Sequence, residues 1–573
     1  MAETSTPAYR PLFPLGAERT VYRRLDLTPP APLAAAGRRF LTLSDATLEG
    51  LASAAFFDLQ HLFRTSHLEQ LAAVVDDPAS SPADRFVSLE LLKNAVIAAG
   101  RVFPSCQDTG TAIVMAKKGQ ELLTAGDDRE PLSRGIRDAY ARYNLRFSQL
   151  APLTMTEEVN TGNNLPAQLE IEAVPGAAYD LLMIAKGGGS ANKTFLFQET
   201  RQLLDPERLL AWLAEKVSEI GTTACPPYHL AIVVGGLSAE QCLKTVKLAS
   251  TRELDELPGR GTTDGQAFRD RGLEQRVLAM TRELGIGAQF GGRHFCHDVR
   301  IVRLPRHNGS LPVGIGVSCS ADRQIKARIT EEGVFLEALD DDPARFLPEA
   351  RIDIGSATPL DLDRPMAAIR ADLARLEVGA PVLLSGTLVV ARDLVHAALA
   401  ERLAAGRPLP AYLEDHPIYY AGPAKTPEGH ASGSFGPTTA ARMDAYMADF
   451  QAAGGALVTV AKGNRSPAVV DACKAHGGFY LATIGGTAAR LGRDMIKAVE
   501  PIDFREFGME AAWRIRVEGM PAFLVIDDKG NDFYRRIRKR QGVPIVREAR
   551  TTPGSTGATT GDPRSADRAG SGR

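Results

Sequence analysis

The stretch with the most potential chemistry is a short loop around the first cysteine of the chain. It reads Phe103-Pro-Ser-Cys-Gln-Asp-Thr-Gly-Thr-Ala112 and carries a thiol, an amide, a carboxylate and a hydroxyl on consecutive residues. Proline and glycine bound it, which indicates a loop between two regular elements. Such a loop can direct one soft metal ligand and several hydrogen-bonding groups into a cleft.

Two further cysteines stand in loops of the same kind. Cys225 lies in Thr222-Thr-Ala-Cys-Pro-Pro-Tyr228 and Cys319 in Gly316-Val-Ser-Cys-Ser-Ala-Asp322. Both follow or precede predicted strands, and open α/β sheets bind their ligands at strand ends. Thiolates select zinc, copper(I) or iron–sulfur clusters, and the spacing alone does not decide among them. A free cysteine is otherwise a small buried hydrophobe. We expect that role for the other three, Cys242, Cys296 and Cys473.

Basic residues near segment ends suggest a site for a small dicarboxylate. They are Arg146, Arg392, Arg442 and Lys462. Taken singly, each would be a solvated surface charge, but a guanidinium presents a fork of donors that matches a carboxylate. Pro437 is predicted to open a helix with Thr438 in its first turn and Arg442 on the same face, which would form an anion site at a helix N-terminus.

Two other segments leave alternatives open. Lys186-Gly-Gly-Gly-Ser-Ala-Asn-Lys-Thr194 fails the P-loop pattern because Asn192 stands where glycine is required. Its glycines either let backbone amides approach an anion or form a plain flexible loop. His307, in Leu304-Pro-Arg-His-Asn-Gly309, is either a proton carrier or a simple loop residue.

The elements that must position these residues alternate between helices and strands. Ser81, Pro82 and Asp84 predict the start of a helix that ends at Gly100 and delivers the Cys106 loop. Helical spacing resumes at residues 132–145, just before Arg146. Buried strands are predicted at residues 169–174, 179–185, 229–234, 299–304, 313–317 and 382–390, and a hairpin turn at residues 331–334.

The chain is too long for one core, and its composition suggests boundaries. Residues 1–40 are Pro-rich and predict a surface arm. Residues 41–350 predict an α/β domain that binds the metal centre, and residues 366–549 a second, swivelling-type α/β domain. The tail, residues 550–573, predicts disorder. The fold class is therefore mixed α/β with two lobes.

Overall composition excludes several classes of protein. Of the 573 residues, 44% are hydrophobic and 24% charged, which is typical of a soluble globular protein. The 67 basic and 69 acidic residues give a net charge of −2, so no global field favours nucleic acid or a membrane. The first 15 residues lack the apolar core of a signal peptide, and six scattered cysteines favour reduced thiols. We expect a cytoplasmic protein.

Together these motifs resemble those of class I fumarate hydratases, the iron–sulfur fumarases, in their single-chain form. The resemblance extends from about residue 10 to about residue 535. Besides the three cysteine loops it includes residues 158–168, 186–194, 288–292, 416–425, 436–442 and 461–465.

The resemblance implies an activity and a cofactor. Cys106, Cys225 and Cys319 would hold a [4Fe–4S] cluster whose fourth iron stays open as a Lewis acid, as in catalytic metal sites with an open position. The reaction would be the reversible hydration of fumarate to (S)-malate by a homodimer. Thr438 would be the base at the malate carbon and Asp108 would have the opposite proton-transfer role. The dicarboxylate would be bound by Gln107, Arg146, Gly189, His307, Arg392, Arg442 and Lys462.

Other functions fit the same residues. A related hydro-lyase could act on tartrate or mesaconate, since the cluster and the cations would serve any small 2-hydroxy dicarboxylate. A non-catalytic iron or redox sensor would use the same cluster without turnover, and a structural zinc protein would use the three thiolates alone.

Overall fold

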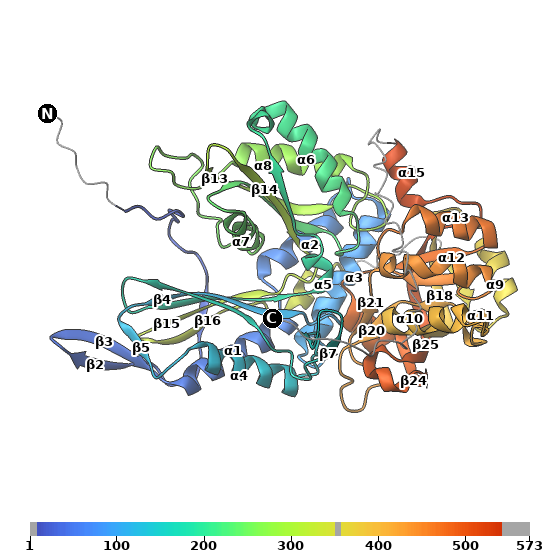
Figure 1. The fold of residues 1–573 in the computed structure, drawn as a ribbon, viewed down its shortest axis with the longest axis horizontal. Helices are drawn as coiled ribbons and strands as arrows, with labels where there is room; N and C mark the ends of the chain where they lie inside the picture. Colours follow the sequence, from blue (N-terminus) through green and yellow to red (C-terminus); the bar gives the residue numbers. More distant parts are fainter. Residues whose placement is uncertain (1–8, 350–356, 541–573) are drawn as a thin grey trace, which may run out of the picture.

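The computed structural model describes residues 9–349 and 357–540. It shows the predicted mixed α/β fold in two lobes, with the N-terminal half on one side and the C-terminal half on the other (Figure 1). The predicted tail, residues 550–573, lies outside the described residues, as do residues 1–8 of the predicted arm and residues 350–356 of the predicted boundary. Among the described residues, no helix is long and apolar enough to cross a membrane.

The N-terminal lobe contains two large sheets. The first has the order β1 (Tyr22–Arg24), β16 (Gly333–Glu337), β15 (Gln324–Thr330), β9 (Tyr179–Lys186), β4 (Thr111–Gly119) and β8 (Gln168–Val174). The second has the order β10 (Phe195–Glu199), β14 (Leu311–Ser318), β11 (Tyr228–Gly236), β13 (Cys296–Arg306) and β12 (Phe268–Arg269). Every residue of β11 is buried, because this strand is central and helices cover both faces of its sheet.

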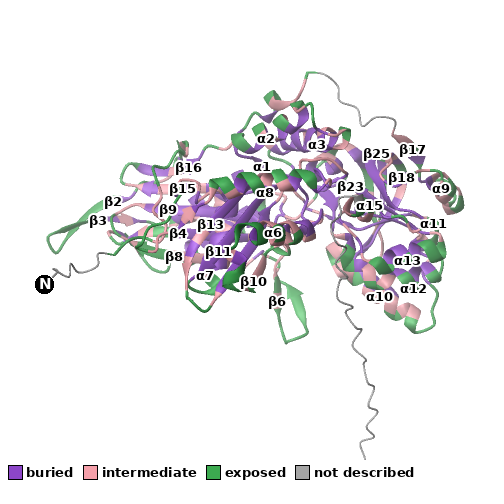
Figure 2. Cartoon of the chain, turned by 90° about the horizontal axis from the view of Figure 1, so that it is seen from above, coloured by how far each residue is buried: buried purple, intermediate pink, exposed green. Residues whose placement is uncertain are grey.

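The strands predicted in this lobe therefore form, and they belong to two separate sheets. The helices of this lobe are α1 (Asp45–His61), α2 (Thr65–Asp76), α3 (Pro82–Ala99), α4 (Arg129–Arg142), α5 (Gly188–Ala191), α6 (Pro206–Ile220), α7 (Ala239–Ser250) and α8 (Arg271–Glu283). Smaller pairings join β2 (Ala31–Ala35), β3 (Arg38–Leu43) and β5 (Leu122–Thr124), and separately β6 (Leu150–Pro152) and β7 (Glu158–Asn160). The exposed β6–β7 hairpin projects from the molecule (Figure 2).

The C-terminal lobe is organised around one sheet. Its order is β17 (Thr358–Asp361), β18 (Pro381–Val390), β19 (Ile418–Tyr419), β22 (Val458–Ala461), β23 (Phe479–Thr483), β25 (Ala512–Ile526) and β24 (Ile496–Asp503). A further pairing of β18 with β25 closes five of these strands into a ring. The helices are α9 (Met366–Leu373), α10 (Asp393–Ala404), α11 (Tyr412–Asp415), α12 (Asp444–Ala452), α13 (Pro467–His476), α14 (Ala488–Arg490) and α15 (Phe533–Arg540).

The two lobes share a hydrophobic core. Leu89 and Leu92 of α3 are buried in the same cluster as the strands of the C-terminal sheet, including Leu388 and Phe523. Burying a leucine side chain contributes about 1.5–3 kcal/mol. The helix that leads into the Cys106 loop is therefore held from both sides, which fixes the position of that loop between the lobes.

Two local predictions differ from the structure. Pro437 ends the short strand β21 (Phe435–Pro437), which pairs with β20 (Ala421–Pro423), and the helix α12 begins only at Asp444. The pairing across strands outweighs the tendency of proline to open a helix. In the predicted arm, residues 22–24 add an edge strand to the first sheet by pairing with residues 335–337.

Asp84 joins the start of α3 to the loop before β13, and it provides a test of the fold. Its buried carboxylate accepts the N–H groups of Ala288 at 2.7 Å and Arg293 at 2.9 Å, besides that of Ser81 at 3.4 Å in the capping box. We predict that Asp84→Ala lowers the free energy of unfolding by about 3 kcal/mol, because it leaves buried donors unpaired. The measurement is the urea midpoint, with the exposed Asp76→Ala as control.

Candidate functional site

The Cys106 loop is held in one conformation by hydrogen bonds on both sides. Ser105 donates its N–H to the Gln60 carbonyl at 2.8 Å, and the Asn94 side-chain amide donates to the Ser105 carbonyl at 2.9 Å. On the other side of the cysteine, Gln107 donates from Nε2 to the Pro437 carbonyl at 3.1 Å. The loop therefore links the N-terminal helices to the segment that carries Thr438.

The loops of Cys225 and Cys319 are joined to each other and to the C-terminal lobe. Ser320, next to Cys319, donates its N–H to the Cys225 carbonyl at 3.0 Å. Lys462, which follows β22, donates from Nζ to Cys225 Sγ at 3.0 Å. After burial, the neighbouring Cys319 and Cys106 also raise the pKa of Cys225, and Cys319 raises that of Cys106, so the fold brings Cys106, Cys225 and Cys319 together.

The thiols and cations of this site influence one another's protonation. Burial raises the pKa of the Cys225 thiol to about 11, and the Lys462 ammonium opposes this. Burial also raises the pKa of Cys106. Burial acts against the charge of Lys462, but Cys225 and Cys106 raise the pKa of its ammonium above the ordinary value. A cysteine of raised pKa keeps its proton until a metal replaces it.

The arrangement of the thiols distinguishes between kinds of metal centre. Among the described residues, the one set of three ligand atoms within 4.8 Å of one another is that of His67, His229 and Asp322, so the three thiols do not form so tight a set. Three thiolates on one zinc ion would lie about 3.8 Å apart, given Zn–S bonds of about 2.3 Å. A cluster of several metal ions, whose corners are farther apart, fits the thiols better than a single zinc ion.

The other side chains near the thiols also suit a cluster. Lys462, Lys186 and Arg323 provide positive charge close to the cysteines. Lys186 donates from Nζ to the Val317 carbonyl at 2.6 Å, and burial lowers its pKa to about 8. Gly485 lies against Cys225, where an added Cβ would come within 2.3 Å of Sγ. The residues present therefore fit a [4Fe–4S] group held by three thiolates.

Asp108 lies beside the thiols and faces three cationic or donor groups. Its Oδ2 accepts the Gly188 N–H at 2.8 Å, and its Oδ1 is 3.4 Å from Arg146 Nη2. Burial opposes ionisation, but Arg146 and Arg323 lower the pKa of Asp108 below its ordinary value. The glycine loop thus brings a backbone amide to this carboxylate, and the neighbouring Gly189 lies close to Lys462 Nζ.

Thr438 is positioned by its backbone and leaves its hydroxyl unpaired. Its N–H donates to the Tyr420 carbonyl at 2.8 Å, and its carbonyl accepts the Lys462 N–H at 3.2 Å. Its buried Oγ1 has no hydrogen-bond partner among the described residues. Because Pro437 is bonded to Gln107, Thr438 lies next to the Cys106 loop.

The arginines gather as a second group. Arg392 is buried, forms an ion pair with Glu510, and has like-charged neighbours in Arg146 and Arg442. Burial, followed by the charge of Arg146, lowers the pKa of Arg392 to about 10. Arg442 is half-exposed and bonds Asp393 through Nε at 3.0 Å and Nη2 at 2.5 Å. A cluster of guanidinium groups of this kind attracts an anion.

His307 is the predicted site residue that a single chain does not bring to the others. It is exposed in the turn between β13 and β14, whereas Cys319 follows the opposite end of β14. That strand, Leu311–Ser318, spans roughly 24 Å at about 3.4 Å per residue. Within one chain His307 therefore stands apart from the thiols.

Other features of the sequence have clear outcomes. The remaining cysteines, Cys242, Cys296 and Cys473, are buried in hydrophobic cores, as predicted. Arg323 was missed, although it follows the quoted Cys319 motif by one residue; its Nη1 donates to Gln60 Oε1 at 2.9 Å. Its position between a cysteine loop and the following strand, β15, was the available signal.

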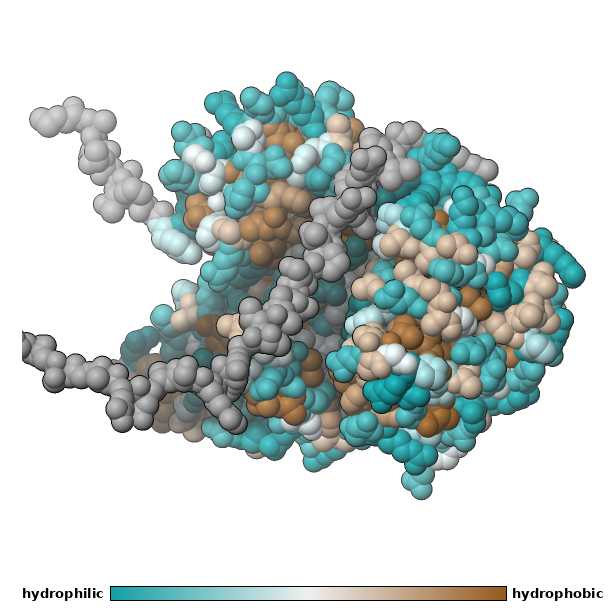
Figure 3. Space-filling model, turned by 45° about the vertical axis from the view of Figure 1, so that its right-hand side comes forward, coloured by the Kyte–Doolittle hydropathy of each residue, from teal (hydrophilic) through white to brown (hydrophobic). Residues whose placement is uncertain are grey.

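A separate cavity lies between the layers of the N-terminal lobe. Its volume is about 890 Å³, and Met115, Leu182 and Leu248 contribute to its wall. The space-filling view is hollowed in this lobe, with apolar surface along the hollow (Figure 3). The described lining includes none of the predicted site residues, so this cavity is distinct from the cysteine site.

The close packing of Gly485 against Cys225 can be tested by its effect on the free energy of unfolding. Gly485→Ala would lower the free energy of unfolding by about 1–3 kcal/mol, because the new methyl group overlaps Sγ. The double variant Gly485→Ala/Cys225→Ala should recover most of this loss, since it removes the overlapping atom. A double-mutant cycle from urea unfolding measures the coupling; strictly additive losses would contradict the contact.

Comparisons with known proteins agree with this geometry. The family model "Fumarate hydratase (Fumerase)" matches residues 50–328, and "Fumarase C-terminus" matches residues 333–537. The chain is 52% identical over 541 residues to "Fumarate hydratase class I, aerobic" of Escherichia coli, covering 94% of this chain and 99% of that protein.

Two more relatives extend the comparison. "Fumarate hydratase 2" of Leishmania major is 55% identical over 502 residues, covering 87% of this chain and 88% of that protein. "Putative L(+)-tartrate dehydratase subunit alpha" of Methanocaldococcus jannaschii is 31% identical over 251 residues, covering 42% of this chain and 82% of that protein. The matches span both lobes of the structure, and the chain therefore belongs to the class I fumarate hydratase family of hydro-lyases.

Proposed function

We propose that this chain hydrates fumarate reversibly to (S)-malate with a [4Fe–4S] cluster held by Cys106, Cys225 and Cys319. The observation that carries the proposal is the convergence of these thiols, from three distant loops, beside the ammonium of Lys462. When bound, the cluster supplies a Lewis acid at an iron that has no cysteine ligand. The rest of the chemistry belongs to side chains of this chain.

The cations of the site would bind the two carboxylates of the substrate. We expect Arg146, Arg392, Arg442 and Lys462 to contact the dicarboxylate, together with Gln107 and Gly189. The proximity of Arg392 to Arg146 and Arg442, and of Gly189 to Lys462, supports this. Removing the proton next to a carboxylate puts extra negative charge on that carboxylate. Guanidinium and ammonium groups already held in position stabilise this charge without reorganising, and that is the usual source of the largest rate effect.

Thr438 and Asp108 would transfer the protons. The unpaired Oγ1 of Thr438 would take the proton from the malate carbon, and return it during hydration. A hydroxyl is a weak base, so it needs the nearby positive charge of Lys462 to stabilise its ionised form. Asp108 is held as a carboxylate by Arg146 and Arg323, so during hydration it would accept a proton from the incoming water.

The similarity to the tartrate dehydratase subunit supports tartrate as an alternative substrate. That relative matches less than half of this chain, and the same cations would bind any small 2-hydroxy dicarboxylate. Fumarate, tartrate and mesaconate should therefore be assayed side by side. Preference for tartrate would replace the proposed substrate and leave the proposed cluster intact.

The cluster is tested by anaerobic reconstitution with iron and sulfide. We predict brown protein with about four irons per chain, loss of fumarate by absorbance, and decay of activity in air, because an exposed iron reacts with oxygen. Cys106→Ser, Cys225→Ser and Cys319→Ser should each lose activity by at least about 100-fold. Cys242→Ser, on a buried cysteine away from the site, is the control.

Colourless protein after reconstitution, or brown protein without turnover, would contradict the proposal. The first result would favour a zinc protein and the second a sensor. Cysteine variants of normal activity would exclude the proposed ligands.

We also propose that the working form is a homodimer in which His307 serves the site of the other copy. Within one chain, His307 is separated from Cys319 by the length of β14. It is exposed, and its ring Nδ1 accepts the Gly309 N–H at 3.1 Å. A second copy could bring this ring to the dicarboxylate, since a twofold interface repeats each contact twice.

Mixing two inactive variants tests this arrangement. We predict that His307→Asn and Cys319→Ser are each inactive alone, and that coexpressed chains recover up to about a quarter of the wild-type activity, because half of the random dimers are mixed and each has one complete site. Recovery should require coexpression or subunit exchange. An inactive mixture would show that His307 serves its own chain, and an active His307→Asn would remove it from the site.

We infer that the protein works in the cytoplasm. All six cysteines are free thiols in the structure, and an oxygen-sensitive cluster with thiolate ligands needs a reducing compartment.

A further inference from the structure

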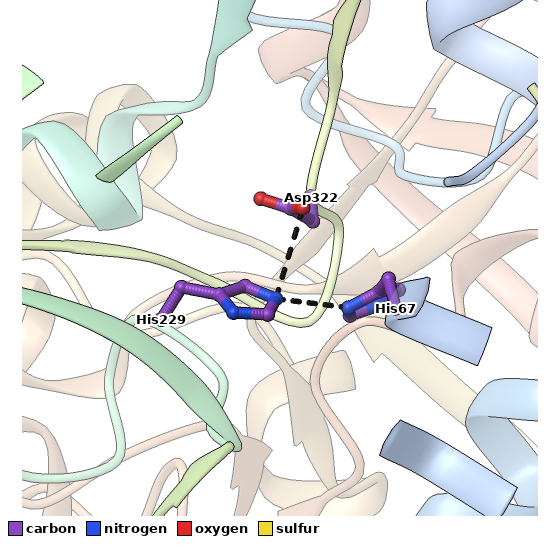
Figure 4. A group of neighbouring side chains, drawn as sticks. All are labelled: His67, His229 and Asp322. Atoms are coloured by element: carbon purple, nitrogen blue, oxygen red, sulfur yellow. Dashed lines mark hydrogen bonds and ion pairs between the residues drawn. The ribbon is translucent and has the colours of Figure 1, made fainter. Parts of the chain in front are cut away.

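Next to the Cys319 loop lies a buried, hydrogen-bonded network of polar side chains that the proposed mechanism does not use (Figure 4). His67 comes from α2, His229 from β11, and Asp322 from the segment after Cys319. Their exposed fractions are 0%, 0% and 2%. Figure 4 shows the His229 ring directed toward both His67 and Asp322. Buried groups of this kind are costly unless every donor and acceptor is paired.

The hydrogen bonds determine where the protons lie. Asp298 accepts from His229 Nδ1 at 2.9 Å, and the Ser320 carbonyl accepts from His67 Nε2 at 3.2 Å. A carboxylate and a carbonyl only accept, so both of these nitrogens carry hydrogen. The Arg252 Nη2 donor also lies 3.4 Å from His229 Nδ1, but this longer contact does not displace the shorter bond to Asp298. The other two nitrogens, His229 Nε2 and His67 Nδ1, face each other at 3.0 Å and need one proton between them. Three protons on four ring nitrogens give the pair one positive charge.

The geometry favours His229 as the ring that carries the shared proton. Its ring lies between two carboxylates, with Asp298 on Nδ1 and Asp322 Oδ2 at 3.7 Å from Nε2. Burial opposes ionisation of both acids, but the His229 charge lowers the pKa of each. Burial lowers the pKa of His67 to about 3, which leaves that ring neutral. The surrounding charged groups include Arg252, 3.7 Å from Asp298, and Arg300, which bonds Asp298 and Asp255. The ring of His297 also packs against both histidines, with centroids 5.5 Å from His67 and 5.4 Å from His229.

At its other end, this hydrogen-bonded network reaches Ser320, whose backbone joins the Cys225 and Cys319 loops. Ser320 follows Cys319 directly, and its N–H donates to the Cys225 carbonyl. Its carbonyl is the acceptor of His67 Nε2. Ser320 is thus held by the Cys225 loop through its N–H and by His67 through its carbonyl. Its side-chain Oγ is buried without a partner among the described residues, so these backbone bonds carry the attachment.

We propose that His67 is a positioning residue for the cluster, and that its neutral ring, oriented by a buried His229 imidazolium, holds the Ser320 backbone that keeps Cys225 and Cys319 at cluster-binding separation. This inference rests on the proposed function, because it assigns the role of the histidines toward the cluster. It adds two residues that lie outside the substrate site and contact no thiol.

A divalent metal ion is the other group that could lie between the rings. It would use His67 Nδ1, His229 Nε2 and Asp322 as ligands, and the bonds to Asp298 and Ser320 would then orient the ligands. The 3.0 Å separation of the two nitrogens is the length of an N–H···N hydrogen bond, and it favours a proton.

Glutamine substitutions distinguish the two rings. At position 67, glutamine can donate from its amide nitrogen to Ser320 and accept from His229 with its amide oxygen. At position 229, two donors are needed at opposite ends, and glutamine has one donor end and one acceptor end. We therefore expect His67→Gln to retain the cluster as the wild type does. We expect His229→Gln to lose it as readily as His67→Leu, which removes the hydrogen bonds of His67 altogether. His61→Leu removes another buried histidine, bonded to the Phe57 carbonyl, and is the matched control.

The experiment has two readouts. After anaerobic reconstitution, His67→Leu and His229→Gln should lose iron to a chelator about 10- to 100-fold faster than the wild type, His67→Gln and His61→Leu. In cluster-free protein, amide exchange in a peptide containing Ser320 should be faster in the same two variants. Circular dichroism confirms that each variant is folded, and if His67→Leu does not fold, the two glutamine variants decide.

The outcomes separate this inference from the proposed function. The inference would be overturned if His67→Leu lost iron no faster than the wild type. It would also be overturned if His67→Gln lost iron as fast as His67→Leu, or if His229→Gln lost iron at the wild-type rate. One equivalent of a divalent metal in cluster-free wild type, lost in His67→Leu, would also overturn it. A wild type that takes up no cluster would refute the proposed function, while the exchange readout would still report on the contact between His67 and Ser320.

Discussion

The contact between the Lys462 ammonium and the Cys225 thiol is the interaction on which the site depends. It joins a cysteine loop of the N-terminal lobe to a residue that follows a strand of the C-terminal lobe, at 3.0 Å. Cys225 is buried and Lys462 is partly buried, so the ammonium relies on the Cys225 sulfur as a hydrogen-bond acceptor where little water reaches it. Moving the lobes apart would leave a cation without its partner, and this couples the site to the packing of the whole chain.

That packing is supplied by helix α3 and the shared core. Its capping box begins the helix at a fixed residue, and its buried leucines lie among the strands of the C-terminal sheet. The Cys106 loop therefore leaves the helix at the boundary between the lobes. A hydrogen bond from Gln107 to Pro437 then brings Thr438 to the same point. The proposed substrate site therefore lies where the two lobes meet.

The charges of the site are arranged in two shells. Cations lie toward the substrate space, where Arg146 and Arg323 keep Asp108 ionised and Arg392 lies among like charges. Behind the Cys319 loop, a second set of charges is neutralised internally, because three cations face three carboxylates: His229, Arg252 and Arg300 against Asp298, Asp322 and Asp255. The first arrangement leaves positive charge for an anion to neutralise. The second leaves none, which is what a rigid support requires.

The sequence by itself determined the local elements and the residue types of the site. Pro82 and Asp84 after Ser81 predicted the start of α3, and the apolar runs predicted most strands, because these signals act within a few residues. The resemblance to class I fumarate hydratases came from the motifs themselves. The tertiary structure alone decided that Pro437 ends a strand, since its partner is in β20. It also brought Lys462 to Cys225, revealed Arg323, and separated His307 from the thiols by the length of a strand. The contacts of Lys462 with Cys225 and of Arg323 with Asp108 join residues more than two hundred positions apart, and local propensities carry no information about which distant groups will meet.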